Sequence, residues 1–286
     1  MFRATRAVLS VRLIARTNFV SRGIHSTARA NGTVSELIPK PAEEQRIGAN
    51  VTLKRFWKKV DVAENHGLLT VTLDKRALRT PEGAKLEVPS SRRLLATLIA
   101  IEWENQEKLI KPHALPMTSI ASRAIDGLQD EGARFDLVAG LIKYFDTDTL
   151  CFHEAHPPAL VQLQEEHWVP LIKWAESTYD IKINIFDSLL GNSQPKESKN
   201  VLMKEINKLN QWEMAAFERA VLTTKSFIIA LGLVKGRIDV EQASQAAHVE
   251  VVSQTQRWGE VEDTHDVDYH DIRRQLGSVA CVLATN

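Results

Sequence analysis

The densest group of potential metal ligands in this 286-residue chain is the run 263–271, Asp-Thr-His-Asp-Val-Asp-Tyr-His-Asp. Carboxylate and imidazole groups bind divalent metals, and such metals activate water in hydrolases. A metal-dependent hydrolase that uses His265, Asp266 and His270 is therefore one hypothesis. The alternative is an acidic loop whose aspartates stabilise the N-terminus of the following helix. We favour the acidic loop, because aspartate is a preferred residue at helix N-termini.

Other catalytic signatures are missing from the sequence. His153 and His156 are three residues apart, but two prolines follow and the chain has no H-E-x-x-H spacing. It also has no G-x-S-x-G, Walker or G-x-G-x-x-G motif, and its 13 glycines are scattered. We therefore expect no catalytic residues, no metal, no cofactor and no enzymatic activity.

Trp258 indicates a different kind of site. It closes an expected helix and is followed by Gly-Glu-Val-Glu-Asp, a run that contains Glu260 and Glu262. Tryptophan is enriched at protein interfaces, where its large apolar ring is buried by the partner. An aromatic residue beside several carboxylates at a helix end suits a surface that binds a basic or apolar partner.

The N-terminal segment has a one-sided charge. Residues 1–35 contain six arginines and no lysine, aspartate or glutamate; the first acidic residue is Glu36. Arginines separated by serine, threonine, alanine and short apolar pieces are typical of a mitochondrial transit peptide, which we place at residues 1–30. Residues 31–50 have no apolar period and are expected to be a linker. We therefore expect a mitochondrial matrix protein.

Composition excludes several other classes. The chain has 36 Lys+Arg and 36 Asp+Glu, so its average charge does not favour binding to nucleic acid. No uninterrupted apolar stretch reaches the 18 or more residues of a membrane span, so we expect no membrane insertion. Cys151 and Cys281 are far apart, which argues against a disulfide framework and fits a reducing compartment.

An N-terminal domain is expected over residues 51–116. The alternation of Leu69, Val71 and Leu73 with threonine is typical of a half-buried strand. A helix should begin at Ser90 or Ser91, and a single helix on a small antiparallel sheet would form a two-layer α/β domain. The expected strands cover four ranges: 56–62, 68–73, 77–79 and 85–88.

A larger, all-helical domain is expected over residues 117–286. Nearly every segment after residue 116 has a helical apolar period, and 181–186 is a short strand or an extended link. The fold class is therefore α+β, with a small sheet-plus-helix domain followed by an orthogonal helical bundle. The expected helices cover seven ranges: 119–128, 134–144, 159–179, 199–209, 213–231, 240–258 and 269–283.

Seven short motifs occur in order along the chain: DKRALRTPEG at 74–83, AIEW at 100–103, MTS at 117–119, AID at 124–126, YFDTDTLC at 144–151, EHW at 166–168 and QRWGE at 256–260. Together they resemble the F1-ATPase assembly factor 2 family of mitochondrial chaperones, and the resemblance extends from about residue 55 to the C-terminus. It implies a non-enzymatic chaperone that binds the unassembled alpha subunit of ATP synthase F1 and prevents its aggregation until it pairs with beta.

The resemblance also suggests which residues matter. It implies an essential acidic position in the last long helical region, for which Glu250 is the first choice and Glu260 the second. With Trp258 and Glu262 these residues form the expected partner-binding set. We assign three other residues to stability rather than to binding, and we expect the free chain to be a monomer. The three structural residues are Trp103, Asp126 and Trp168.

Overall fold

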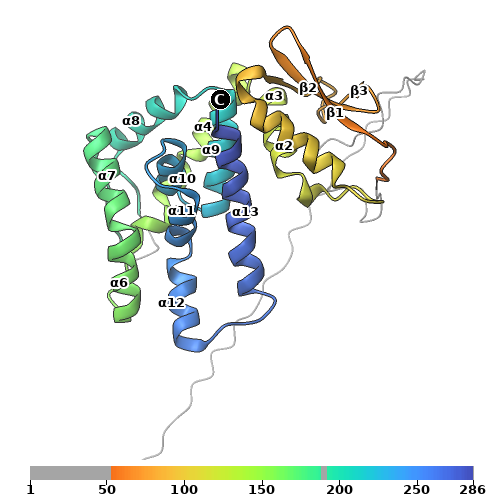
Figure 1. Ribbon diagram of the computed structural model, residues 1–286. Coiled ribbons are helices and arrows are strands. Elements are labelled where there is room, and N and C mark those ends of the chain that lie inside the picture. Colours follow the sequence, from red (N-terminus) through yellow and green to blue (C-terminus); the bar gives the residue numbers. More distant parts are fainter. Residues whose placement is uncertain (1–52, 188–191, 286) are drawn as a thin grey trace, which may run out of the picture. The chain divides into compact units, whose positions relative to one another are not determined.

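The computed structural model describes residues 53–187 and 192–285 (Figure 1). The expected transit peptide at 1–30 and the linker at 31–50 lie outside the described residues. The described chain consists of a small antiparallel sheet with helices, followed by a mostly helical region. This confirms the expected α+β fold class.

The sheet is built around β2 (Leu68–Leu73), which pairs antiparallel with each of the other three strands. Its partners are β1 (Val60–Asn65), β3 (Arg76–Ala77) and β4 (Glu87–Pro89). In the β1–β2 hairpin, Val62 lies opposite Val71. His66 and Gly67 form the two-residue turn with φ of 47° and 76°, the positive values that a tight hairpin requires.

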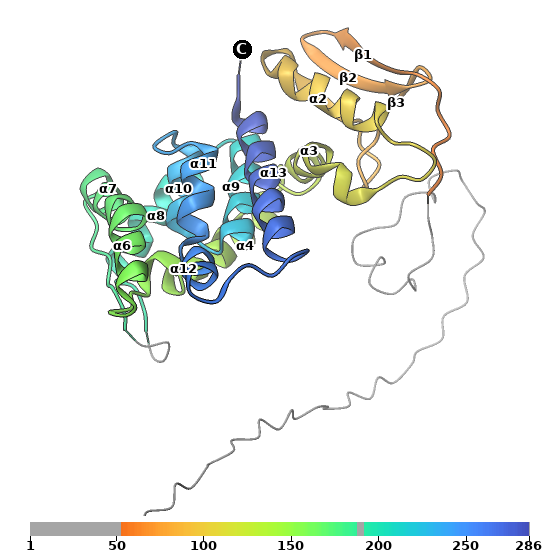
Figure 2. The same cartoon turned by 60° about the horizontal axis from the view of Figure 1, so that its bottom comes forward.

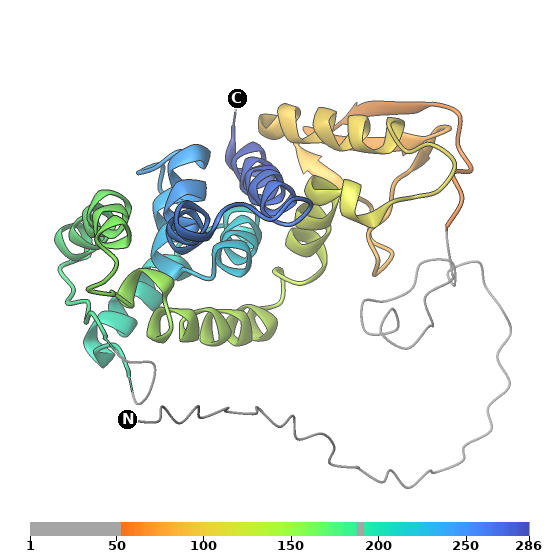
Figure 3. The same cartoon turned by 90° about the horizontal axis from the view of Figure 1, so that it is seen from below.

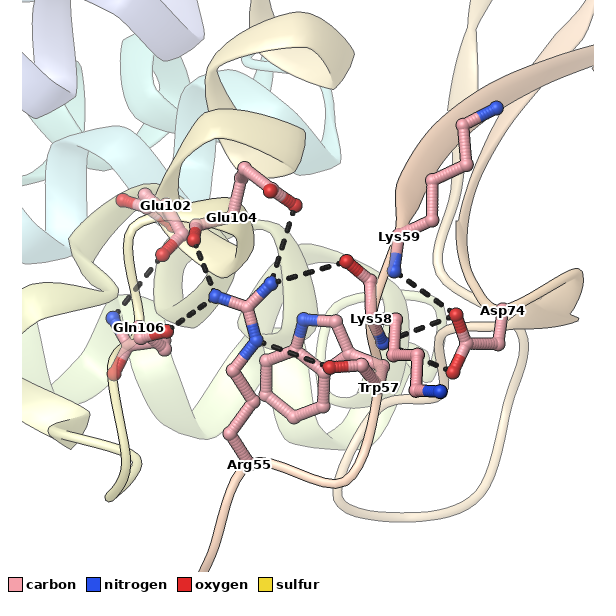
Figure 4. Close-up of polar contacts among 8 residues, drawn as sticks. All are labelled: Arg55, Trp57, Lys58, Lys59, Asp74, Glu102, Glu104 and Gln106. Atoms are coloured by element: carbon pink, nitrogen blue, oxygen red, sulfur yellow. Dashed lines mark hydrogen bonds and ion pairs between the residues drawn. The ribbon is translucent and has the colours of Figure 1, made fainter.

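The expected first strand is displaced in the structure. We expected it at 56–62, but β1 begins at Val60. The backbone N–H groups of Lys58 and Lys59 donate to the carboxylate of Asp74, at 3.0 and 2.9 Å, instead of joining a strand ladder (Figure 4). These two hydrogen bonds lower the pKa of Asp74 below its usual value.

Helix α2 (Arg93–Glu104) covers the sheet, as Figure 2 shows. Leu95 and Ile99 have no exposed surface and contact the apolar side of the sheet. The C-terminal end of α2 is bound by Arg55, whose guanidinium donates to the carbonyl oxygens of Glu104 and Gln106 at 2.7 and 2.6 Å (Figure 4). A cation that satisfies the last carbonyls of a helix also interacts favourably with the helix dipole.

The rest of the described chain is helical, and its centre is formed by α9 and α10 (Figure 1). Every residue of α10 from Phe227 to Leu233 is buried, and α9 contacts α3, α10 and α13. The helices are α3 (Pro116–Asp126), α4 (Glu131–Leu141), α5 (Lys143–Asp146), α6 (Pro158–His167), α7 (Val169–Tyr179), α8 (Lys196–Asn207), α9 (Gln211–Thr224), α10 (Phe227–Val234), α11 (Val240–Ala247), α12 (Val249–Trp258) and α13 (His265–Leu283).

Four helices that the apolar period predicts as continuous are each divided in two. The range 134–144 is interrupted at Ile142, between α4 and α5. The range 159–179 is interrupted between α6 and α7, where Pro170 lies in the first turn of α7 and lacks an N–H group. The range 213–231 is interrupted at Lys225, which has a left-handed φ of 57°. The range 240–258 is interrupted at His248, whose backbone leaves the helical region. The expectation of single helices was wrong at these points.

Arg92 connects the sheet-containing part to the last helix. Its side chain is buried, and its guanidinium donates to the carbonyl oxygen of Val282 in the last turn of α13. The same group lies over the ring of Trp212, 6.0 Å from the centroid. Helix α3 contacts α2 as well as α9 and α13. The two-domain division at residue 116 stays a prediction.

Trp103 is half-buried between α2 and α3. Its indole N–H donates to the hydroxyl of Thr118 at 3.1 Å, and its ring lies 5.1 Å from that of Trp57. We predict that Trp103→Arg lowers the soluble yield and the free energy of unfolding by roughly 1–3 kcal/mol, because a charge replaces the packed ring. Urea unfolding with Trp103→Phe as the control would measure this. A Trp103→Arg variant as stable as the unmodified chain would contradict the assignment.

Candidate functional site

The strongest candidate site is the surface where α12 ends and the chain turns into α13, here called the α12–α13 tip (residues 257–267). Trp258 is 70% exposed, and Val261 and Val267 are each 59% exposed. Figure 3, which views the molecule from below, shows this loop facing the viewer. Large apolar side chains in adjoining exposed positions mark surfaces that bind other molecules.

The α12–α13 tip is strongly acidic. Between residues 249 and 271 the sequence has seven aspartates and glutamates but a single basic residue, Arg257. Glu260, Glu262 and Asp263 are exposed, and within the described part of the chain they accept no hydrogen bond and join no ion pair. The tip therefore offers unpaired carboxylates next to apolar side chains.

Glu250 lies in the first turn of α12 and is exposed. It precedes Trp258 by eight residues, which is about 12 Å along a helix axis. Glu250, Gln254 and Arg257 recur every three to four residues, so they share one face of α12. The structure therefore places Glu250 two turns from the tip, on the same helix as Trp258.

Two contacts that the sequence did not indicate join α13 to the helices that precede the tip. The imidazole of His248, at the start of α12, lies 3.0 Å from a carboxylate oxygen of Asp268 in α13. Arg273 of α13 donates to both carboxylate oxygens of Glu241 in α11, at 2.9 and 2.7 Å. Bidentate pairing of this kind fixes orientation as well as distance. These partners are too distant in sequence for any local pattern to reveal them.

The residues of the hydrolase hypothesis do not form a metal site. The His265 ring accepts a hydrogen bond from the N–H of Val261 at 3.1 Å, and the rings of His270 and Tyr269 meet edge to face at an interplanar angle of 90°. Asp266 lies in the first turn of α13, as the acidic-loop interpretation requires. Over 53–187 and 192–285, no group of three or more His, Cys, Asp or Glu residues could hold a metal ion. The hydrolase alternative has no support there.

The three residues assigned to stability lie at contacts between helices or between a helix and a turn. Trp168 is fully buried, and its indole N–H donates to the carbonyl oxygen of Ala246 at 2.7 Å. A carboxylate oxygen of Asp126 accepts the N–H of Glu82 at 3.3 Å, joining the end of α3 to the turn after β3. These contacts are compatible with structural roles, which stay predictions.

A cavity of about 330 Å³ between α2 and the start of α3 is a weaker candidate. Its buried carboxylate, Glu102, accepts hydrogen bonds from the N–H groups of Met117 and Thr118 at 2.7 and 2.9 Å. The Thr118 hydroxyl donates to the same carboxylate at 2.6 Å. Burial raises the pKa of Glu102 above its usual value. Since its oxygens already have three donors, Glu102 joins α2 to α3 rather than offering a free ligand group.

None of the helices in the described residues combines the length and apolar character that a transmembrane span needs.

A family model described as "ATP12 chaperone protein" matches residues 54–176. "Protein atp12, mitochondrial" of Schizosaccharomyces pombe is 34% identical over 237 residues, which cover 80% of this chain and 81% of that protein. "Protein ATP12, mitochondrial" of Saccharomyces cerevisiae is 34% identical, with coverage of 84% and 86%. The crystal structure of Atp12 from Paracoccus denitrificans superposes with a TM-score of 0.69 at 29% identity, covering 80% of this chain and 97% of that one.

Proposed function

The chain belongs to the ATP12 chaperone protein family, and from this premise we propose that it assists the assembly of mitochondrial ATP synthase by binding the unassembled F1 alpha subunit. Two similar proteins are named as mitochondrial, which supports a mitochondrial location. The arginine-rich residues 1–30 support import into mitochondria. We place the chain in the matrix, because a chaperone of F1 subunits must share their compartment. The alpha subunit as client rests on the motif resemblance described above.

The physical problem that such a chaperone solves is the exposure of an interface. A subunit made for an obligate complex has a large apolar surface while it is alone, and this surface aggregates unless it is covered. The chaperone must also release the subunit to its true partner. A contact with a small apolar centre and a polar rim satisfies both needs, because its affinity is moderate.

The single observation that supports this function best is the 70% exposed Trp258 within an acidic tip. We propose that Trp258 and Val261 contact apolar side chains of the client, while Glu260 and Glu262 pair with basic ones. Glu250, two turns away on α12, would extend the contact along the helix. In this proposal the chain acts as a monomer and needs no metal or nucleotide.

Charge reversal at the tip tests the proposal. We expect isolated F1 alpha subunit to co-purify with the mature chain, and the Glu260→Lys/Glu262→Lys double variant to bind at least about tenfold more weakly, since two attractions become repulsions. Glu250→Lys, tested separately, should also weaken binding. Affinity is measured by biolayer interferometry after circular dichroism has established that each variant is folded.

A double variant elsewhere provides the matched control. Asp136 and Glu107 are exposed and have no ion-pair partner in the part of the chain that the structure describes, so Asp136→Lys/Glu107→Lys changes net charge equally. It should bind alpha like the unmodified chain. Equal weakening of alpha binding in both double variants would mean that net charge, and not the position of the residues, causes the effect. Absence of alpha binding by the unmodified chain would overturn the proposed function.

A further inference from the structure

Arg257 contacts an aromatic ring at the α12–α13 tip. Its guanidinium carbon lies 5.1 Å from the ring centroid of Trp258, within the range of a cation–π interaction. Arginine has five N–H donors and commonly pairs with carboxylates. Among the residues that the structure describes, Arg257 joins no carboxylate, although Glu260, Glu262 and Asp263 follow within six positions. The guanidinium of Arg257 therefore covers a face of the Trp258 ring, whereas the carboxylates nearby have no cationic partner.

The charge around this contact determines which kind of partner fits. Arg257 is the only basic residue among seven acidic ones between 249 and 271. The tip therefore repels an anionic partner and attracts a cationic one. Trp258 and Val261 add exposed apolar surface, so the complementary group is a basic side chain with apolar neighbours.

We propose that the tip binds an arginine or lysine of the client on the face of Trp258, and that Arg257 occupies this position in the free chain. This inference rests on the proposed function and specifies the client chemistry of the same site. The incoming cation gains both the aromatic ring and the carboxylates of Glu260 and Glu262. Arg257 moves off the ring when the client binds.

Occupation of the Trp258 ring by Arg257 lowers the apparent affinity for the client. Only chains in which Arg257 has left the ring can bind the incoming cation, so the observed dissociation constant is increased by the inverse of that fraction. An exposed cation–π contact shifts such a balance by about two- to fivefold. The contact would therefore keep client binding moderate, as release to the true partner requires.

The test removes Arg257 and leaves Trp258. We expect Arg257→Gln to bind isolated F1 alpha subunit about two- to fivefold more tightly than the unmodified chain. Trp258→Ala should bind more weakly than either. Arg237 is the matched control, because it is exposed and without an ion-pair partner in the described residues, and Arg237→Gln changes net charge equally. Binding by Arg257→Gln that is weaker than, or equal to, binding by Arg237→Gln would overturn the proposal.

A peptide probe separates this inference from the identity of the client. A synthetic peptide of alternating leucine and arginine is titrated into the unmodified chain, and the indole resonance of Trp258 is followed by NMR with Trp258→Phe for assignment. The same peptide with citrulline in place of arginine has the same shape but no charge. We expect the shift with arginine only. Equal shifts with both peptides would overturn the cation site, whereas arginine-dependent shifts without capture of alpha would overturn only the proposed client.

Discussion

Trp168→Ala will lower the free energy of unfolding by about 3–5 kcal/mol, the usual effect of truncating a fully buried tryptophan. Trp168 has no exposed surface, and its N–H group donates to the carbonyl oxygen of Ala246 between the α6–α7 junction and α11. The variant loses the packed ring and leaves the carbonyl of Ala246 without this donor. Urea unfolding followed by circular dichroism measures the change.

Trp258→Ala is the natural control for that experiment. It removes the same side chain, but from a 70% exposed position, so the free energy of unfolding should change by no more than about 0.5 kcal/mol. The two variants therefore separate a tryptophan of the core from one of the candidate site. Similar unfolding midpoints for both would contradict the structural role of Trp168.

Asp148→Ala will also be strongly destabilising. The carboxylate is fully buried and accepts the backbone N–H groups of Leu150 and Ile228 at 3.0 and 2.9 Å, so it joins the turn after α5 to the start of α10. Alanine leaves both donors buried without a partner, at about 1–3 kcal/mol for each. Removing a desolvated charge offsets part of this loss. Thermal unfolding at neutral pH should show a clearly lower midpoint for Asp148→Ala. An unchanged midpoint would contradict this prediction.

The effect of this position should depend on pH. Burial raises the pKa of Asp148 to about 6, against the opposing effect of its hydrogen bonds, so the folded chain binds this proton more tightly than the unfolded chain. The stabilising contribution is complete below the unfolded pKa of 3.8 and is lost as pH rises through about 6. Asp148→Asn cannot titrate. The free energy of unfolding of Asp148→Asn should therefore fall further below that of the unmodified chain at about pH 5 than at about pH 8. The opposite trend would contradict the raised pKa.

The sequence predicted correctly those helices and strands whose formation depends on residues close together in the chain. The alternation of Leu69, Val71 and Leu73 locates β2 with its observed bounds, because one face of this strand is buried. The same logic misplaced β1, since the backbone of Lys58 and Lys59 is bound by Asp74, a residue from the other side of the hairpin. No property of residues 56–62 indicates that partner.

Helix interruptions are invisible to the apolar period when both halves are buried. The stretch around Lys225 stays apolar on both sides, yet the chain turns there and the Ser226 hydroxyl accepts the N–H of Ile229 at 3.0 Å, as an N-cap does. Ser226 and Pro170 were therefore available signals in the sequence. At His248 the helix is interrupted where the imidazole contacts Asp268 of α13, a partner for which the sequence has no local signal.

The candidate site was predictable in part for the same reason. Trp258 among carboxylates is a local feature, and its exposure agrees with that expectation. The placement of Arg257 on the ring depends on side-chain conformation, which the sequence does not specify. The pairing of Glu241 with Arg273 joins α11 to α13, two helices that are separated in sequence by α12.

The contact between Arg92 and the carbonyl oxygen of Val282 joins residues 190 positions apart. Contacts between residues this far apart form more slowly than local ones, because closing a long loop costs conformational entropy before the contact is made. The sheet and α2 are held by contacts within residues 60–104, whereas the buried guanidinium of Arg92 gains this acceptor only when α13 is in place. We therefore expect the docking of α13 to be a late step of folding.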